Sequence, residues 1–277
     1  MAIRSDGLLT KKRILQSCVR LFLENGYRRT TMQQILREAQ VSSSSFQNLF
    51  HSKDGVLLEL VDFMFENQFG TARKVAGAEL PPVYVYAAET ALQITLTDLS
   101  ENLRQIYLDA YTQQRLLDYI QRATAKELHR IFGPYQPELT ELNENLREIY
   151  LEAYTRQHLL DYIQQATTKE LYQIFGPYQP ALTEQDFYEL ELGTSGLMRA
   201  YMAHPCTEDF PLERKLNRFV TLALRGYKVP EEELQRVLAF LRGLDIRTIA
   251  REVMEELFRQ LAMRYEFSPD GLLPPEK

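Results

Sequence analysis

The sequence predicts an all-α protein with a small N-terminal domain and a larger helical domain. Apolar residues recur at helical spacing, and beyond Gly70 no segment shows the alternation expected of a half-buried strand. Charge is also divided unevenly. Residues 1–55 hold nine Lys/Arg against four Asp/Glu, a net charge of +5, so the −6 of the whole chain leaves −11 for residues 56–277. We therefore expect a basic domain over 1–55 and an acidic helical domain over 56–277.

The N-terminal domain is predicted to contain three short helices, preceded by an arm at residues 1–9. The first helix, over 11–25, carries a regular apolar face and ends before a glycine. The second, over 32–39, begins with a capping box, because Thr31 precedes Gln34 by three residues and each can satisfy a free backbone amide of the other. A turn of about three residues leads to the third helix.

The third predicted helix begins after the N-cap Ser42 and has two unlike faces. One face is apolar, and the other carries only small hydroxyls and amides, among them Gln47 and Asn48. Two short helices joined by a tight turn, the second without negative charge, are typical of a helix-turn-helix that enters the DNA major groove. Many three-helix units bind nothing, and a serine run can serve only as a cap. The basic charge of this domain favours DNA, because phosphate neutralisation requires it.

Residues of about 8–60 resemble the DNA-binding domain of TetR/AcrR-type transcriptional regulators. The stretches that carry the resemblance are ILQSCVRLFLENGYRRTTMQQIL and AQVSSSSFQNLFHSKDGVL. The resemblance implies phosphate contact by Thr31, groove contact by the third helix, and DNA-backbone contact by Lys53 at the start of a fourth helix. The DNA-binding residues so implied are Thr31, Ser42, Ser43, Ser44, Ser45, Gln47, Asn48 and Lys53.

Three positions depart from the pattern of that family. Gln40 stands at the glycine common in the turn, Ser44 at a glycine common inside the third helix, and Gln47 at an aromatic residue that contacts phosphate. These departures leave the expected fold unchanged and affect only the individual contacts with DNA.

The larger domain is predicted to be helical almost to its end. Helices are expected at about 54–70, 82–99, 183–203, 211–226, 230–243 and 245–265, followed by a loose proline-rich tail. The resemblance implies that this domain senses a small molecule and forms a homodimer through a four-helix bundle, for which 211–226 and 245–265 are the candidates. Dimerisation also follows from DNA recognition, because one short recognition helix contacts too few base pairs for useful specificity.

The larger domain also contains a tandem duplication. Residues 101–143 are followed at once by 144–186, and 32 of the 43 paired positions are identical. Repeat solenoids generally need at least three copies to bury a continuous core, so an insertion within a regulatory domain is favoured. Either one copy takes the original place while the other packs beside it, or the helices join and lengthen the domain.

Aromatic residues suggest a pocket for an apolar or flat effector in this domain. The candidates are Tyr107, Tyr111, Tyr150, Tyr154, Tyr188, Met198 and Tyr201. Simple packing between helices is the alternative for each of them. The four histidines are scattered, so no metal site is expected, and no cofactor is indicated.

Several other functional classes find little support. The sequence lacks a glycine-rich phosphate loop, a Gly-x-Ser-x-Gly elbow, a His-Glu-x-x-His helix and a Cys-x-x-Cys pair, so catalysis is not expected. It has neither a long apolar span nor an apolar signal core, and Cys18 and Cys206 are predicted to be reduced thiols, which together indicate a cytoplasmic protein with no membrane attachment. The sequence thus predicts a homodimeric, ligand-responsive repressor that binds double-stranded DNA at a pseudo-palindrome. The alternative is a helical protein-interaction module with weakened DNA binding, for which the repeat provides the docking surface.

Overall fold

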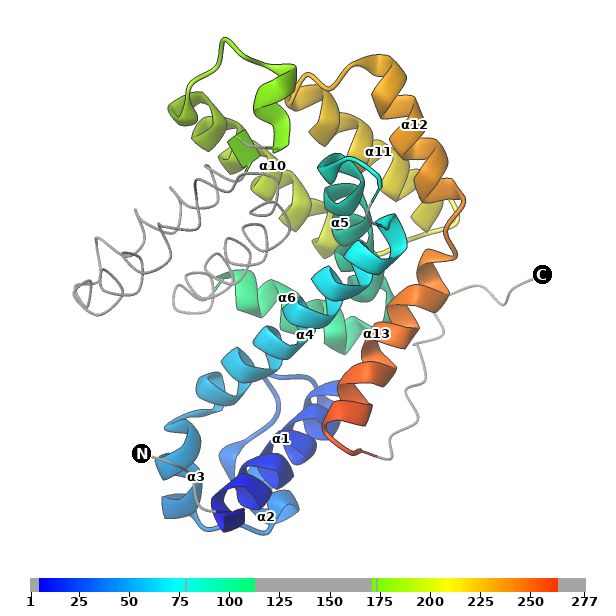
Figure 1. The fold of residues 1–277 in the computed structure, drawn as a ribbon. Helices are drawn as coiled ribbons and strands as arrows, with labels where there is room; N and C mark the ends of the chain where they lie inside the picture. Colours follow the sequence, from blue (N-terminus) through cyan, green and yellow to red (C-terminus); the bar gives the residue numbers. More distant parts are fainter. Residues whose placement is uncertain (1–4, 78, 113–170, 173, 264–277) are drawn as a thin grey trace.

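The computed structural model describes residues 5–77, 79–112, 171–172 and 174–263 (Figure 1). Every regular element in these ranges is a helix, which confirms the all-α fold. No helix in them is both long and apolar enough to cross a bilayer. Most of both repeat copies lies outside the described residues, together with Tyr150 and Tyr154.

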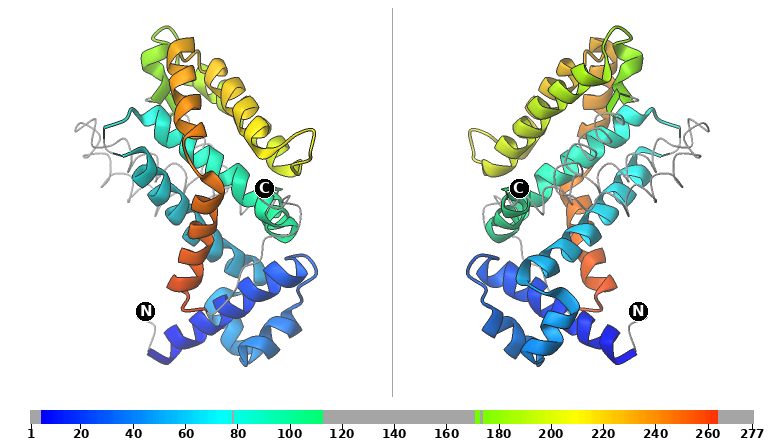
Figure 2. Two further views of the ribbon diagram at one scale, coloured as in Figure 1. Left: turned by 90° about the vertical axis from the view of Figure 1, so that its right-hand side faces the viewer. Right: turned by 90° about the vertical axis from the view of Figure 1, so that its left-hand side faces the viewer.

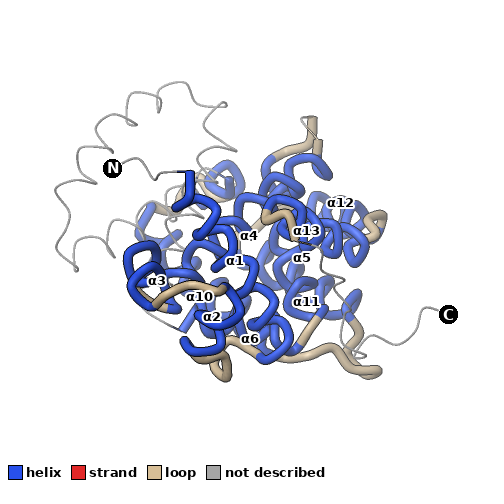
Figure 3. The backbone as a smooth tube through the Cα atoms, turned by 90° about the horizontal axis from the view of Figure 1, so that it is seen from below, coloured by secondary structure: helices blue, strands red, loops and turns tan. Residues whose placement is uncertain are grey.

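The N-terminal domain, called the head below, consists of α1 (Ser5–Asn25), α2 (Met32–Ala39) and α3 (Ser43–Phe50). The capping box predicted between Thr31 and Gln34 is present, and Ser42 caps α3 as expected. The expected arm at residues 1–9 was wrong from Ser5 onward, because α1 already begins there. Seen from below, α3 lies at the outer edge of the head (Figure 3).

Three helices follow the head along the chain: α4 (Lys53–Ala76), α5 (Pro82–Leu99) and α6 (Glu101–Thr112). Of these, α4 and α6 contact the head. The fourth helix is longer than predicted and leads straight out of the head into the domain above. Nearly all of α5 is buried, because α4, α6, α10, α11, α12 and α13 surround it. The helix α5 is therefore the centre of the larger domain.

The remaining helices follow the predicted order. They are the short 3₁₀ turn η3 (Gly176–Tyr178), then α10 (Glu184–Ala203), α11 (Leu212–Gly226), α12 (Glu231–Arg242) and α13 (Ile246–Gln260). The last helix runs back beside α5 and α4 toward the head, so the C-terminal end of the described chain lies close to α1 (Figure 2).

The structure corrects the helix faces proposed for the dimer bundle. Most of the apolar side chains on α11 and α13 are buried within the chain itself, including Phe219, Ala223, Val253, Leu257 and Leu261. They face α5, α4 and neighbouring helices, so they are not available to a second subunit. A dimer would have to use a different surface.

The described core draws on both copies of the duplication. Its helix α6 is the beginning of the first copy, whereas Leu171, Ile174 and Phe175, all buried, come from the end of the second copy. The described core therefore contains the beginning of the first copy and the end of the second, and these together resemble one repeat unit.

Deleting residues 113–155 should leave a folded protein that still binds DNA. This deletion joins Thr112 to Arg156 and removes one repeat length of 43 residues without changing any described core residue. Shortening the connection between Thr112 and the end of the second copy changes the free-energy cost of closing it by only about 1 kcal/mol. Circular dichroism and size-exclusion chromatography would check the result. Removing 144–186 instead serves as the control, because Leu128, Ile131 and Phe132 would then have to replace the buried residues of the second copy. An insoluble product from the first deletion would show that residues 113–155 belong to the core.

Candidate DNA interface and sensor region

The helix α3 has one face in the core of the head and one face in solvent. Phe46 and Phe50 are buried, one turn apart, with ring centroids at 5.8 Å. The side chains of Ser43, Gln47 and Asn48 are exposed, and they form no hydrogen bond within the described chain. Residues four apart share a helix face, so Ser43 lies beside Gln47, and Asn48 lies beside the exposed Ser44 on the adjoining part of the surface. Together they form a polar surface that is able to meet base edges.

The other predicted hydroxyls are engaged in capping. Ser42 Oγ accepts a hydrogen bond from the Ser45 amide at 3.1 Å and lies 3.0 Å and 2.9 Å from the hydroxyls of Ser44 and Ser45. Thr31 Oγ1 likewise caps α2, accepting from the Gln34 amide at 3.3 Å. These residues fix where α2 and α3 begin, and all but the half-buried Ser45 are exposed.

Lys53, at the start of α4, forms its observed contacts within the head. Its Nζ donates to the carbonyl oxygens of Tyr27 and Thr30 at 2.8 Å and 2.9 Å and lies 4.2 Å from the centroid of the Tyr27 ring. Burial lowers the pKa of this amine. In this conformation Lys53 holds the loop between α1 and α2, and its implied contact with the DNA backbone stays a prediction.

In the turn between α2 and α3, Gln40 occupies the position where the family commonly has glycine. Gln40 has φ 52° and ψ 50°, the left-handed conformation in which the family's usual glycine is unstrained. For a residue with a Cβ this conformation costs about 1–2 kcal/mol. The turn therefore keeps its shape despite the substitution.

Several basic residues of the head are already paired. Arg20 contacts Glu38 at 2.9 Å, and Lys11 contacts Glu59 at 2.6 Å. Four others, Lys12, Arg13, Arg29 and Arg37, form no ion pair with any residue in the described ranges. These four can supply the sequence-independent attraction to phosphate.

Comparison with known proteins agrees with this geometry. Residues 14–60 match the family described as "Bacterial regulatory proteins, tetR family". This match lies within the head and the start of α4, so residues 14–60 are similar to the DNA-binding segment of that family of regulators.

Two individual proteins are also similar to this chain. An uncharacterised HTH-type transcriptional regulator of Bacillus subtilis (strain 168), YuxN, is 28% identical over 93 residues, which are 34% of this chain and 30% of that protein. The crystal structure of a gamma-butyrolactone receptor (ArpA-like protein) covers 91% of this chain and 99% of its own at 14% identity, with a TM-score of 0.35. That TM-score is too low to define the arrangement of the larger domain.

Helix α6 holds the head by two polar contacts. Asn102 Nδ2 donates to the Leu23 carbonyl at 2.7 Å, at the end of α1. The guanidinium of Arg28 binds the buried carboxylate of Asp109 through both oxygens, with Nε at 2.9 Å and 3.1 Å. An apolar cavity of about 30 Å³ lies where α1, α4, α6 and α13 meet.

The residues predicted to line a pocket are dispersed or undescribed. Tyr107 is buried and accepts a hydrogen bond from Gln68 Nε2 of α4 at 2.5 Å, whereas the half-buried Tyr201 packs edge-on to Phe219 with centroids at 5.6 Å. Met198 is buried on α10. The side chains of Tyr111 and Tyr188 are not described, so the predicted pocket stays a prediction.

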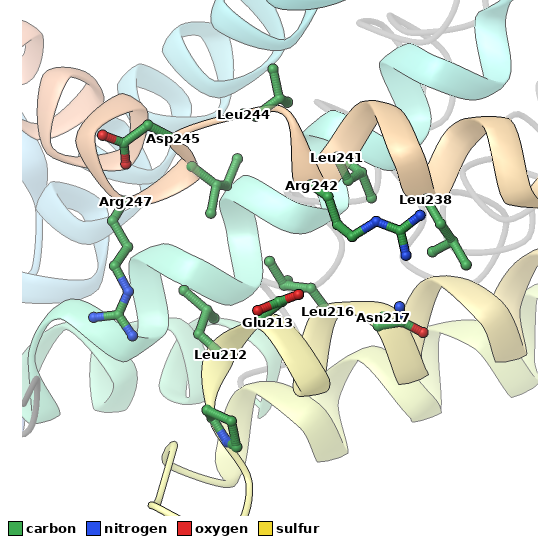
Figure 4. A pocket seen from close by; sticks show the side chains of 12 residues that line it. Leu212, Glu213, Leu216, Asn217, Leu238, Leu241, Arg242, Leu244, Asp245 and Arg247 are labelled. Carbon is green, nitrogen blue, oxygen red and sulfur yellow. The ribbon is translucent and has the colours of Figure 1, made fainter.

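An open groove of about 430 Å³ lies elsewhere, between the start of α11 and the corner joining α12 to α13 (Figure 4). Leucine side chains form much of its wall, and Arg242 and Arg247 lie at its edge. None of the predicted pocket residues lines it. It is a surface feature of the C-terminal helices.

A cluster of acids and aromatic rings, not predicted from the sequence, lies next to α5 and is called the acid cluster below. It consists of Tyr86, Glu89, Phe175, Glu191 and Tyr227. Phe175 stacks on Tyr227 with centroids 4.0 Å apart and an interplanar angle of 3°, and Tyr86 lies edge-on to both at 5.2 Å and 6.3 Å. Glu89 and Glu191 are each only 7% exposed. The signal available in the sequence was a lone acid in the apolar run 83–96.

Burial changes the ionisation of both carboxyl groups. It raises the pKa of Glu89 to about 8, and it raises the pKa of Glu191 to about 7 against the opposing effect of Arg199. Loss of hydration disfavours the charged form, and no described residue forms a hydrogen bond or ion pair with the Glu89 carboxyl. These groups therefore destabilise the fold when they ionise.

Glu89→Gln should raise the free energy of unfolding at pH 8 and leave it nearly unchanged at pH 4. Below the unfolded pKa of 4.5, Glu89 is protonated in both states and adds no penalty. As the pH rises from 4.5 to about 8, the unfolded state releases its proton first, so the wild type loses stability that the amide keeps. Urea unfolding at the two pH values measures the difference. An equal effect at both values would mean that Glu89 does not titrate with the raised pKa.

Proposed function

We propose that this protein is a ligand-responsive repressor that binds a two-fold symmetric operator as a homodimer. The observation that carries the proposal is the polar surface of α3, where Ser43, Gln47 and Asn48 are exposed and unbonded on a helix whose other face is anchored by Phe46 and Phe50. Amide side chains at such positions can form paired hydrogen bonds with adenine. Repression, as opposed to activation, follows from family resemblance.

The DNA contacts divide into two kinds. Gln47, Asn48 and Ser43 are assigned to base edges, and Arg13, Arg29 and Arg37 to phosphates. Thr31, Ser42, Ser44 and Ser45 position the two helices and can add contacts through the groups that capping leaves unused. Lys53 acts by holding the α1–α2 loop in place.

The dimer is assigned to the outward face of α10 and α11, which pack side by side as antiparallel neighbours. Leu192 and Leu222 are 46% and 50% exposed and lie at about the same height along the pair. Beside Leu192, Gly193 and Gly196 have nothing within 4 Å of where a Cβ would be, and the exposed Ala200 lies on the same face. Small residues next to exposed leucines allow two helix pairs to approach closely.

Leu192→Arg combined with Leu222→Arg tests this dimer assignment. Four like charges would then meet at the interface, so we expect a monomer by light scattering with the helix content unchanged. Leu8→Arg, another exposed leucine but on α1, is the control and should leave the mass unchanged. A double variant that stays dimeric would place the interface elsewhere.

The proposed response to a ligand is a population shift. The effector must bind more tightly to a conformation in which the two heads no longer fit successive major grooves. The contacts of α6 with the head, through Asn102 and Asp109, and the continuity of α4 with the head support this route. A movement of either helix would change the separation of the heads.

Selection of bound sequences from random duplex DNA tests the DNA assignment. The wild type should enrich a two-fold symmetric site. Gln47→Ala or Asn48→Ala should relax the preference at particular positions by about 1–3 kcal/mol each, whereas Arg37→Ala should weaken all sequences alike. No enrichment by the wild type, or a changed preference only in Arg37→Ala, would contradict the assignment of α3.

A further inference from the structure

The two carboxyl groups of the acid cluster are unfavourable for the fold. Glu89 has no hydrogen bond or ion pair with any described residue, and Glu191 Oε2 is buried without a hydrogen-bond partner. A buried carboxyl group costs free energy unless it is paired, and an apolar side chain of similar size would pack there without that penalty. Two such groups near the same ring, Tyr86, are not explained by packing.

The surroundings of these carboxyl groups favour positive charge. Tyr86, Phe175 and Tyr227 place three aromatic rings beside the acids, and the Tyr227 hydroxyl lies 2.8 Å from Thr194 Oγ1 on the same helix as Glu191. Aromatic faces attract cations, and the attraction grows when the cation is removed from water. Among described residues, the basic group that influences these acids is Arg199, whose side chain is exposed.

We propose that the acid cluster recognises an organic cation with aromatic or other apolar surface, with Glu89 and Glu191 neutralising the charge and the rings of Tyr86, Phe175 and Tyr227 contacting the hydrocarbon. The proposal rests on the sensor role proposed above and names the chemical class of the effector. A bound cation would favour the ionised form of both carboxyl groups, whereas a bound anion would disfavour it.

The location of this site connects it with the head. Tyr86 and Glu89 lie on α5, and α5 packs against α4 and α6, two of the helices that reach the head. Phe175 belongs to the end of the second repeat copy, so one of the duplicated segments contributes a ring to the site. A cation that draws the two carboxyl groups together would act on the central helix of the domain.

Calorimetric titration of the full chain with two ions of the same shape tests the proposal. Tetraphenylphosphonium and tetraphenylborate differ in charge sign, and benzyltrimethylammonium provides a smaller cation. We expect at least one cation to bind and the borate not to bind. Glu89→Gln and Glu191→Gln should each weaken cation binding by about tenfold or more. Glu189→Gln, an exposed acid two residues from Glu191, is the matched control and should bind like the wild type.

The outcomes separate this proposal from the sensor role. Binding of neither cation, equal binding of the borate, or unchanged affinity in both glutamine variants with unchanged thermal midpoints would overturn the cation site. If a cation binds through Glu89 and Glu191 but does not alter affinity for the selected duplex, the result supports the cation site and contradicts ligand-responsive regulation. If only another class of ligand releases DNA, the result supports the regulation and contradicts the cation site.

Discussion

Phe46→Ala is expected to lower the free energy of unfolding of the head by about 3–5 kcal/mol, the usual cost of removing a fully buried phenyl ring. Phe46 lies on the buried face of α3 and contacts Phe50, so its loss leaves a cavity behind the exposed face of the same helix. We expect affinity to fall for every DNA sequence, because the helix that carries the base contacts is no longer held in place.

Gln47→Ala is the matched control for this cavity, one residue along the same helix. Its side chain is exposed and unbonded, so the stability should change by less than about 0.5 kcal/mol. Urea unfolding followed by circular dichroism, together with hydrogen exchange of residues 32–50, would measure both effects. A stable Phe46→Ala beside an unstable Gln47→Ala would mean that the two faces of α3 are reversed.

Gly55→Ala is expected to destabilise the head by about 1–3 kcal/mol or more, because a Cβ at this position would lie 2.1 Å from the Phe50 carbonyl oxygen. That oxygen belongs to the turn between α3 and α4, where Ser52 N also donates to it at 2.6 Å. Backbone atoms cannot move aside as a flexible side chain does. The added methyl group should therefore displace α3 relative to α4 and reduce DNA affinity.

Gly70→Ala provides the comparison within the same helix. Its Cβ would meet only the end of the Arg73 side chain at 3.9 Å, so replacing a mid-helix glycine should stabilise the protein by about 0.5–1 kcal/mol. Thermal unfolding of the two variants side by side measures the contrast. Equal stability of the two variants would be inconsistent with the close approach of α3 and α4 at Gly55.

Local sequence rules predicted the head almost completely. Short-range hydrogen bonds determine the bounds of α2, Met32–Ala39, and the caps at Thr31 and Ser42. The residue types at these positions predict such bonds directly. The position of Lys53 was not predictable in this way. Its ammonium group turns toward carbonyl oxygens of a loop more than twenty residues earlier, and only the packed structure brings them together.

The larger domain shows the same division between local and distant information. Periodicity located α10 to α13, but it could not say which partner each apolar face would meet. The faces of α11 and α13 were expected in a dimer, yet Phe219 and Val253 are buried in the chain's own core. The acid cluster was missed for a similar reason, because Glu89, Glu191 and Phe175 are brought together from three separate segments. Glu89, an acid within the apolar helix α5, was the local indication of this cluster.

The central claim, that a symmetric pair of heads reads DNA, is tested most directly by a single binding comparison over a salt series. The selected two-fold duplex would be compared with a duplex that contains one half-site and with a scrambled duplex of the same length. We expect the two-fold duplex to bind most tightly, with affinity falling steeply and linearly on a logarithmic salt scale as phosphate contacts are lost. Equal affinity for all three duplexes, or an affinity insensitive to salt, would contradict the account.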